Sequence, residues 1–138
     1  MSKFLIDAKI SAGEIADRIS ILTLKWERAS ASDDEMGEAG EAWKSVRRLC
    51  NNESLANLDS AKRALDYTNA SLWHIEDLAR TRGSTVCEHA ILVLDLIQKA
   101  NLLRCMIKAE IDHIVFPSGS GTSVSAINSK VYHGKDAK

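Results

Sequence analysis

The sequence has few cysteines, and their positions argue against two common classes of small protein. Cys50, Cys87 and Cys105 are the three in 138 residues, and they lie far apart and never form a Cys-x-x-Cys pair. An odd number at this spacing favours neither a disulfide framework nor a zinc site. We therefore expect a cytoplasmic protein whose thiols are reduced.

A long apolar run and an excess of positive charge are also missing. The longest apolar stretch, residues 90–97, contains Asp95 and is far shorter than the roughly 20 residues that span a bilayer. The N-terminus carries charge before any apolar run reaches the length of a secretory signal. Lysine plus arginine total 18 against 19 acidic residues, so no cationic field attracts nucleic acid or anionic lipid. We expect neither nucleic acid nor a membrane as a partner.

The sequence lacks the motifs of nucleophilic hydrolases and of common phosphate-binding loops. Its four histidines never occur as His-x-x-x-His, and Gly-x-Ser-x-Gly is absent. The run Ser118-Gly119-Ser120-Gly121-Thr122-Ser123 has no lysine and no strand-to-helix setting, so it is typical of a linker and not of a P-loop. The sequence therefore leaves open whether the protein is an enzyme.

What the chain does contain is helical periodicity over most of its length. Apolar residues recur every three to four positions, and capping boxes begin at Ser11 and Thr85. The predicted helices cover residues 12–29, 34–50, 53–81 and 86–114. The last two would each be about 40 Å long, and a turn at Gly83 should fold them into an antiparallel hairpin.

These elements predict an all-α fold: a helical bundle built on the long antiparallel hairpin, with a short extended N-terminal segment and an irregular C-terminal tail. The bundle domain should span residues 1–116, and residues 117–138 should form a Gly/Ser-rich linker and tail.

Apolar positions predict which faces of the helices are buried. On the first helix, the stripe that should face the core consists of Ile15, Ile19, Leu22 and Trp26. On the fourth helix, apolar residues spread around most of the circumference, which is typical of a helix buried from more than one direction. The shorter first two helices would cover only part of this surface. We therefore expect a homodimer or a larger homo-oligomer.

Charged residues form a dense stripe on the first helix. Its members are Glu14, Asp17, Arg18, Lys25 and Arg28. Glu14 and Arg18 have the i,i+4 spacing of a helical ion pair. The other three have no partner on their own helix, so each must meet solvent, another helix or a ligand.

The third helix carries a comparable polar line. Its members are Lys62, Asp66, Asn69, Trp73, Glu76 and Arg80. The spacing predicts two i,i+4 pairs, Lys62 with Asp66 and Glu76 with Arg80. Trp73 is a large aromatic on a polar stripe, so it needs cover from a neighbouring helix or subunit, or a flat ligand to stack upon. Cover is the favoured interpretation.

On the fourth helix, Asn101, Arg104 and Lys108 are three and four residues apart, so one face presents an amide, a guanidinium and an ammonium. Such a face suits phosphate or carboxylate groups. The alternative, which we favour, is that Arg104 pairs with an acid on the first or third helix and Lys108 pairs with Asp112.

The chain contains three polar motifs in a set order. They are Ile10-Ser11-Ala12-Gly13-Glu14 continuing through Asp17-Arg18-Ile19 to Lys25 and Arg28; Leu72-Trp73-His74-Ile75-Glu76-Asp77 with Arg80; and Asn101, Arg104 and Lys108 with Glu110-Ile111. In this order they resemble a family of small uncharacterised bacterial α-helical proteins, grouped as a domain of unknown function. The resemblance covers about residues 10–114 and implies that the polar positions act as one unit, but it brings no assigned activity.

Glu14 and Asp17 are also similar to one of the acidic pairs with which MazG-type all-α nucleotide pyrophosphohydrolases hold magnesium near a triphosphate. The second pair is missing, because Glu76 and Asp77 are adjacent and lie about 100° apart on a helix. One or two carboxylates can hold magnesium together with phosphate and water. This resemblance implies a Mg²⁺ site formed by Glu14, Asp17 and Glu76.

Two functions follow from these patterns. The first is an oligomeric assembly or interaction module, whose charged stripes are interhelical ion pairs and whose Trp73 lies near an interface. The second is magnesium-dependent binding or hydrolysis of a nucleotide or another phosphorylated small molecule, with phosphate neutralised by Lys25, Arg104 and Lys108. The full candidate cluster is Glu14, Asp17, Lys25, Arg28, Trp73, Glu76, Arg80, Asn101, Arg104 and Lys108. Both functions require the first, third and fourth helices to bring their polar faces together.

Overall fold

The computed structural model describes residues 11–82 and 87–117, and all regular structure in these ranges is α-helical, which confirms the all-α fold. The four helices are α2 (Ala12–Glu27), α3 (Asp33–Arg47), α4 (Asn52–Arg82) and α5 (Cys87–Val115). Each lies close to its predicted range. The N-terminal segment, the turn at Gly83 and the C-terminal tail were predicted for residues outside the described ranges. The antiparallel hairpin that this turn would close stays a prediction.

Local capping explains where α2 and α3 begin. The hydroxyl of Ser11 accepts a hydrogen bond from the backbone N–H of Glu14 at 3.1 Å. Ser32 and Glu35 form a full capping box, in which each side chain accepts from the other residue's backbone N–H. Three acidic residues in the first turn of α3 also complement the helix dipole. These contributions keep α3 continuous although Gly37 and Gly40 lie within it.

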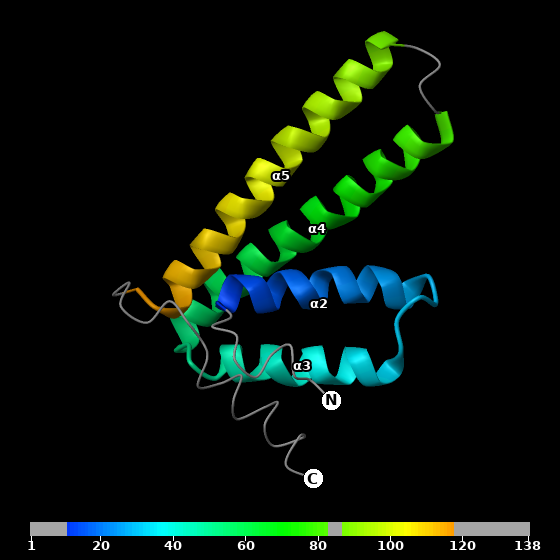
Figure 1. The fold of residues 1–138 in the computed structure, drawn as a ribbon. Helices are drawn as coiled ribbons and strands as arrows, with labels where there is room; N and C mark the ends of the chain where they lie inside the picture. Colours follow the sequence, from blue (N-terminus) through cyan, green and yellow to red (C-terminus); the bar gives the residue numbers. More distant parts are fainter. Residues whose placement is uncertain (1–10, 83–86, 118–138) are drawn as a thin grey trace.

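The two longest helices, α4 and α5, lie side by side, and α2 and α3 pack across one end of the pair (Figure 1). Helix α2 contacts each of the other three. The other ends of α4 and α5, near residues 82 and 87, project beyond α2 and α3 (Figure 1). In the described part of the chain, α2 and α3 therefore cover one end of the α4–α5 pair and leave the other end uncovered (Figure 1).

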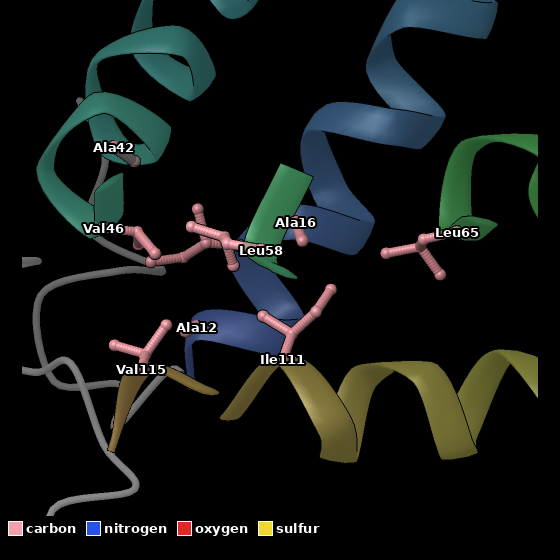
Figure 2. Packing of buried hydrophobic residues seen from close by; sticks show 9 residues of the cluster. Ala12, Ala16, Ala42, Val46, Leu58, Leu65, Ile111 and Val115 are labelled. Atoms are coloured by element: carbon pink, nitrogen blue, oxygen red, sulfur yellow. The ribbon is translucent and has the colours of Figure 1, made fainter. Parts of the chain in front are cut away.

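The core lies where the four helices meet (Figure 2). Among the described residues its buried members are Ala12, Ile15, Ala16, Ala42, Val46, Leu58, Leu65, Ile111 and Val115. Three of them are alanines, which let the helix backbones approach closely. The four largest fully buried side chains are Leu58, Leu65, Ile111 and Val46. Each such side chain contributes about 1.5–3 kcal/mol by leaving water.

Gly13 marks the closest approach of α2 to α5. The residue is buried, and a Cβ atom built on it would lie closer than 3.0 Å to both the carbonyl oxygen and the carbonyl carbon of Lys108. Its backbone N–H donates to a carboxylate oxygen of Asp112 at 2.8 Å. The backbones of the two helices are therefore in direct contact, which fixes how their polar side chains face each other.

The prediction that Trp26 faces the core is wrong. Its side chain is 48% exposed, and its indole Nε1 donates to Asp33 Oδ1 at 2.7 Å. The buried residues of α2 end at Ser20. The last turns of α2 therefore lie beyond the core, and helical periodicity alone does not show where along its length a helix stops being covered.

The outward face of α5 is apolar and exposed. Its seven large exposed side chains are Ile91, Leu92, Leu94, Leu96, Leu102, Leu103 and Met106, each between 43% and 69% accessible. None of the helices in the described ranges combines the length and the apolar character needed to cross a membrane. Among the described residues, α4 and α2 therefore cover α5 on one side only.

Candidate functional site at the junction of α2, α4 and α5

A buried carboxylate on α2 is the centre of the polar contacts between three helices. Asp17 is 3% exposed and accepts two hydrogen bonds from Arg104 of α5, from Nε at 2.9 Å and from Nη2 at 2.5 Å. Asn69 of α4 donates to the same carboxylate and to the hydroxyl of Ser20, each at 3.0 Å. The prediction that Arg104 pairs with an acid on the first or third helix is confirmed.

The surroundings keep this pair ionised at neutral pH. Burial raises the pKa of Asp17, but hydrogen bonds from Arg104 and Asn69, together with the charges of Arg104 and Lys108, outweigh it and lower the pKa below its ordinary value. The hydrogen bond to Asp17 is in turn the largest contribution that raises the pKa of Arg104. A two-point pair between a guanidinium and a carboxylate is the strongest ordinary charged contact in proteins.

Lys108 does not pair with Asp112, so that prediction is wrong. Its Nζ lies 2.5 Å from Oε2 of Glu14 and 3.9 Å from Oδ2 of Asp17. Asp112 instead accepts the backbone N–H of Gly13 in the first turn of α2, where helix N–H groups have no partner within the helix. Burial raises the pKa of Asp112. The close approach of α2 to α5 offers both residues partners on the other helix.

Trp73 is half-buried, and Arg28 at the C-terminal end of α2 lies over its ring, so a neighbouring element provides part of the cover that the favoured interpretation required. The guanidinium carbon of Arg28 lies 4.3 Å from the centroid of the Trp73 ring, and Arg28 Nη1 lies 3.3 Å from a carboxylate oxygen of Asp77. Arg80 also pairs with Asp77, so the predicted pair of Arg80 with Glu76 is wrong. Arg80 thus pairs with the acid three residues before it, and Glu76 is left without this partner.

The first predicted pair on α4 is confirmed, because Lys62 Nζ lies 2.8 Å from Asp66 Oδ1. Lys62 Nζ also lies 5.7 Å from the centroid of the Trp43 ring. This contact is on the side of α4 that faces α3, and it belongs to the structural framework rather than to the candidate cluster.

A cavity of about 160 Å³ lies between α2, α4 and α5, and half of the candidate cluster lines it. The candidates on its wall are Lys25, Trp73, Glu76, Asn101 and Arg104, and the remaining wall residues are Ile21, Leu24, Asn69 and Leu72. Among the described residues, neither Lys25 nor Glu76 forms an ion pair. The structure therefore brings polar side chains from three helices to one small space.

The acidic residues proposed for magnesium are not gathered into one group. Within residues 11–82 and 87–117, no set of three or more His, Cys, Asp or Glu side chains is placed to hold a metal ion. Glu14 faces Lys108, and both carboxylate oxygens of Asp17 accept from Arg104. Lys108 and Arg104 therefore contact the carboxylates that would have to bind Mg²⁺ in the metal hypothesis.

Sequence reasoning missed two features of the polar network. One is the participation of Ser20, and the other is the hydrogen bond from Asn69 to Asp17. Asn69 belongs to the predicted polar line on α4, four residues before Trp73, and it is 5% exposed. A buried amide must find hydrogen-bond partners. A helical position that is polar and flanked by predicted core positions, as Asn69 is by Leu65 and Leu72, is the signal that identifies such residues.

Comparison of the chain with protein-family models, with curated protein sequences and with solved structures finds no match in any of the three. The resemblances to the small bacterial family and to the MazG-type enzymes stay expectations. The function is therefore argued from the geometry.

Proposed function

We propose that the chain is an assembly module that pairs with a second copy of itself through the outward face of α5. The observation that supports this proposal is the row of seven exposed large apolar side chains on one helix. Isolated exposed leucines are common on protein surfaces, but many large exposed apolar side chains on one helix are typical of an interaction surface.

The size of this face agrees with a protein interface. At their observed exposures, the seven side chains present on the order of 700 Å² of apolar surface. The largest apolar patch on a typical monomer is about 300–600 Å², whereas a standard stable interface buries about 800 Å² on each partner. A second copy would therefore cover an area close to what a stable dimer needs.

The spacing within the row suits helix-to-helix packing. The positions of Leu92, Leu96, Lys99, Leu103 and Met106 follow the alternating steps of four and three residues that form a seam between paired helices. Lys99 occupies the seam position between Leu96 and Leu103, and its ammonium is paired with Asp95 at 2.9 Å. The charge in the middle of the seam is thus already neutralised within the chain.

Changing two leucines of the seam to glutamate, Leu96→Glu with Leu103→Glu, should convert a dimer into a monomer. Each fully buried leucine contributes about 1.5–3 kcal/mol, so the dimer dissociation constant should rise by about 100-fold or more. Light scattering coupled to gel filtration should give twice the 15.2 kDa chain mass for the parent protein and the chain mass for the variant. The helical circular dichroism should be unchanged, because both side chains are exposed within the single chain.

Leu49→Glu is the matched control, because Leu49 is 46% exposed and lies outside α5. It should leave the mass of the assembly unchanged. A parent protein that is monomeric at about 100 µM would contradict the proposal, and so would a double variant that keeps the dimer mass.

The alternative function, magnesium-dependent binding or hydrolysis of a nucleotide or another phosphorylated small molecule, has weaker support. Glu14 and Asp17 are engaged by Lys108 and Arg104, so holding a metal would first require those ion pairs to separate. Leaving one partner of a buried pair such as Asp17 with Arg104 uncompensated costs about 3–5 kcal/mol. The cavity beside this network instead indicates a different kind of ligand.

A further inference from the structure

We propose that the cavity between α2, α4 and α5 binds a small apolar amino acid, or a zwitterion of that size and chemistry. Its carboxylate would face Lys25, Arg104 and Asn101, and its ammonium would face Glu76. This capacity is independent of the proposed pairing through α5, and it needs no metal ion.

The charges on the cavity wall favour a zwitterion over a simple anion or cation. Arg104 is neutralised by Asp17, so the wall's remaining formal charges are the ammonium of Lys25 and the carboxylate of Glu76. These two form no ion pair with each other or with any other described residue. A phosphate would be repelled by Glu76 and an amine by Lys25, whereas a ligand with both charges is attracted by both.

Hydrogen-bond donors are available on the side of the cavity where the carboxylate would lie. Arg104 uses Nε and Nη2 for Asp17 and one Nη1 hydrogen for Asn101 Oδ1 at 3.4 Å. A guanidinium has five N–H donors, so about two are left. Because Asn101 accepts through its oxygen, its amide nitrogen is left to donate. Asp17 therefore holds Arg104 in position, and charged hydrogen bonds of this kind orient a carboxylate.

Most of the remaining wall is apolar and is formed by Ile21, Leu24, Leu72 and the ring of Trp73. Asn69 also lines the cavity, and its amide nitrogen donates to Asp17 and Ser20. A volume of about 160 Å³ is many times the roughly 10–15 Å³ of such volume that one water molecule needs. The space therefore has room for a small organic molecule such as an aliphatic or aromatic amino acid.

A purely structural role for these charges would give a different geometry. Structural cations on this face are already paired: Arg104 with Asp17, Lys108 with Glu14, and Arg28 with Asp77. Lys25 and Glu76 belong to the same stripes but line an open space without pairing. Two opposite charges kept apart at one small cavity are the combination that a zwitterion satisfies.

The test follows each tryptophan separately by ¹⁹F NMR on the full chain labelled with 5-fluorotryptophan. The three signals, from Trp26, Trp43 and Trp73, are assigned with single Trp→Phe variants. Titration with leucine, isoleucine and phenylalanine should shift the Trp73 signal and leave the other two in place. The N-acetyl and methyl ester forms of the same amino acids should bind about tenfold or more weakly, because each lacks one charge.

Two variants test separately how the ammonium and the carboxylate of the ligand are recognised. Glu76→Gln should weaken binding of the free amino acid by about tenfold or more and remove its advantage over the N-acetyl form. Lys25→Met should weaken binding similarly and remove the advantage over the methyl ester. Glu41→Gln and Lys44→Met are the matched controls, since this exposed pair lies on α3 away from the cavity, and they should leave binding unchanged.

Three results would overturn the proposal. One is the absence of any Trp73 shift at about 10 mM of each of the three amino acids, because any dissociation constant would then be weaker than that of ordinary binding. Another is a shift by inorganic phosphate as large as that by the amino acids, which would make the cavity a site for anions only. The third is binding that neither Glu76→Gln nor Lys25→Met weakens. Circular dichroism on each variant shows whether the fold is retained, so a loss of binding is not confused with unfolding.

Discussion

Gly13→Ala is expected to destabilise the fold by about 3 kcal/mol, the upper part of the range for overpacked sites. The added Cβ would lie closer than 3.0 Å to backbone atoms of Lys108, and a backbone cannot move aside as the end of a side chain can. Helix α2 would have to shift away from α5. That shift would also stretch the hydrogen bond from Gly13 to Asp112 and the ion pair of Asp17 with Arg104. Urea denaturation at one fixed protein concentration measures the effect.

Gly37→Ala and Gly40→Ala are the matched controls, because both glycines lie within α3 and an added Cβ would meet nothing within 4 Å. Each should stabilise the protein by up to about 1 kcal/mol, the ordinary gain of alanine over glycine within a helix. If Gly13→Ala behaved like these two, the close contact of α2 with α5 would be wrong.

Asp17→Asn is expected to cost about 3 kcal/mol or more, because it leaves Arg104 without its counter-charge in a largely buried position. The side chain of Asp17 is 5% exposed and that of Arg104 is 29% exposed. The hydrogen bond that Asn69 donates to residue 17 would also weaken, because its acceptor would no longer carry a charge. The Trp73 response to amino acids should weaken as well, because Asp17 positions Arg104 at the cavity.

Two further variants identify the cause of this loss. Glu41→Gln removes an acid from an exposed i,i+3 pair and should cost no more than about 1 kcal/mol. Adding Arg104→Met to Asp17→Asn should recover part of the stability, because it removes the unpaired buried charge. If the double variant lost more unfolding free energy than the two single variants lose together, the ion pair would not be what links the two residues.

The effect of Asp17 should depend on pH in a defined direction. Its pKa is lowered in the folded protein from an ordinary value of 3.8, so its stabilising contribution is present above pH 3.8 and is lost as the pH falls through the folded value. The stability difference between the parent protein and Asp17→Asn should therefore be constant near neutral pH and shrink below about pH 4. Urea titrations at several pH values measure it, and a difference that grows in acid would contradict the ionised pair.

The helices and their starting points follow from the sequence because they depend on neighbouring residues. Ser11 with Glu14 predicted the start of α2, and the acidic first turn of α3 was recognised as favourable. The pair of Lys62 with Asp66 was predicted for the same reason, because i,i+4 spacing brings two side chains together on any helix. The all-α fold needed no more than this periodicity, whereas the gathering of the three polar stripes was a requirement that only the packing of the helices could meet.

Partner choice between helices was decided by the tertiary structure alone. The sequence offered Lys108 an acid on its own helix, Asp112, yet the contact of α2 with α5 at Gly13 brought Glu14 within reach and gave Asp112 a helix N-terminus to bind. Periodicity likewise placed Trp26 on the core face, but α2 extends past the core before that residue. Spacing along one helix determines which side chains share a face. Only the distance and rotation between helices determine which of several long, flexible side chains meet, and which faces are left uncovered.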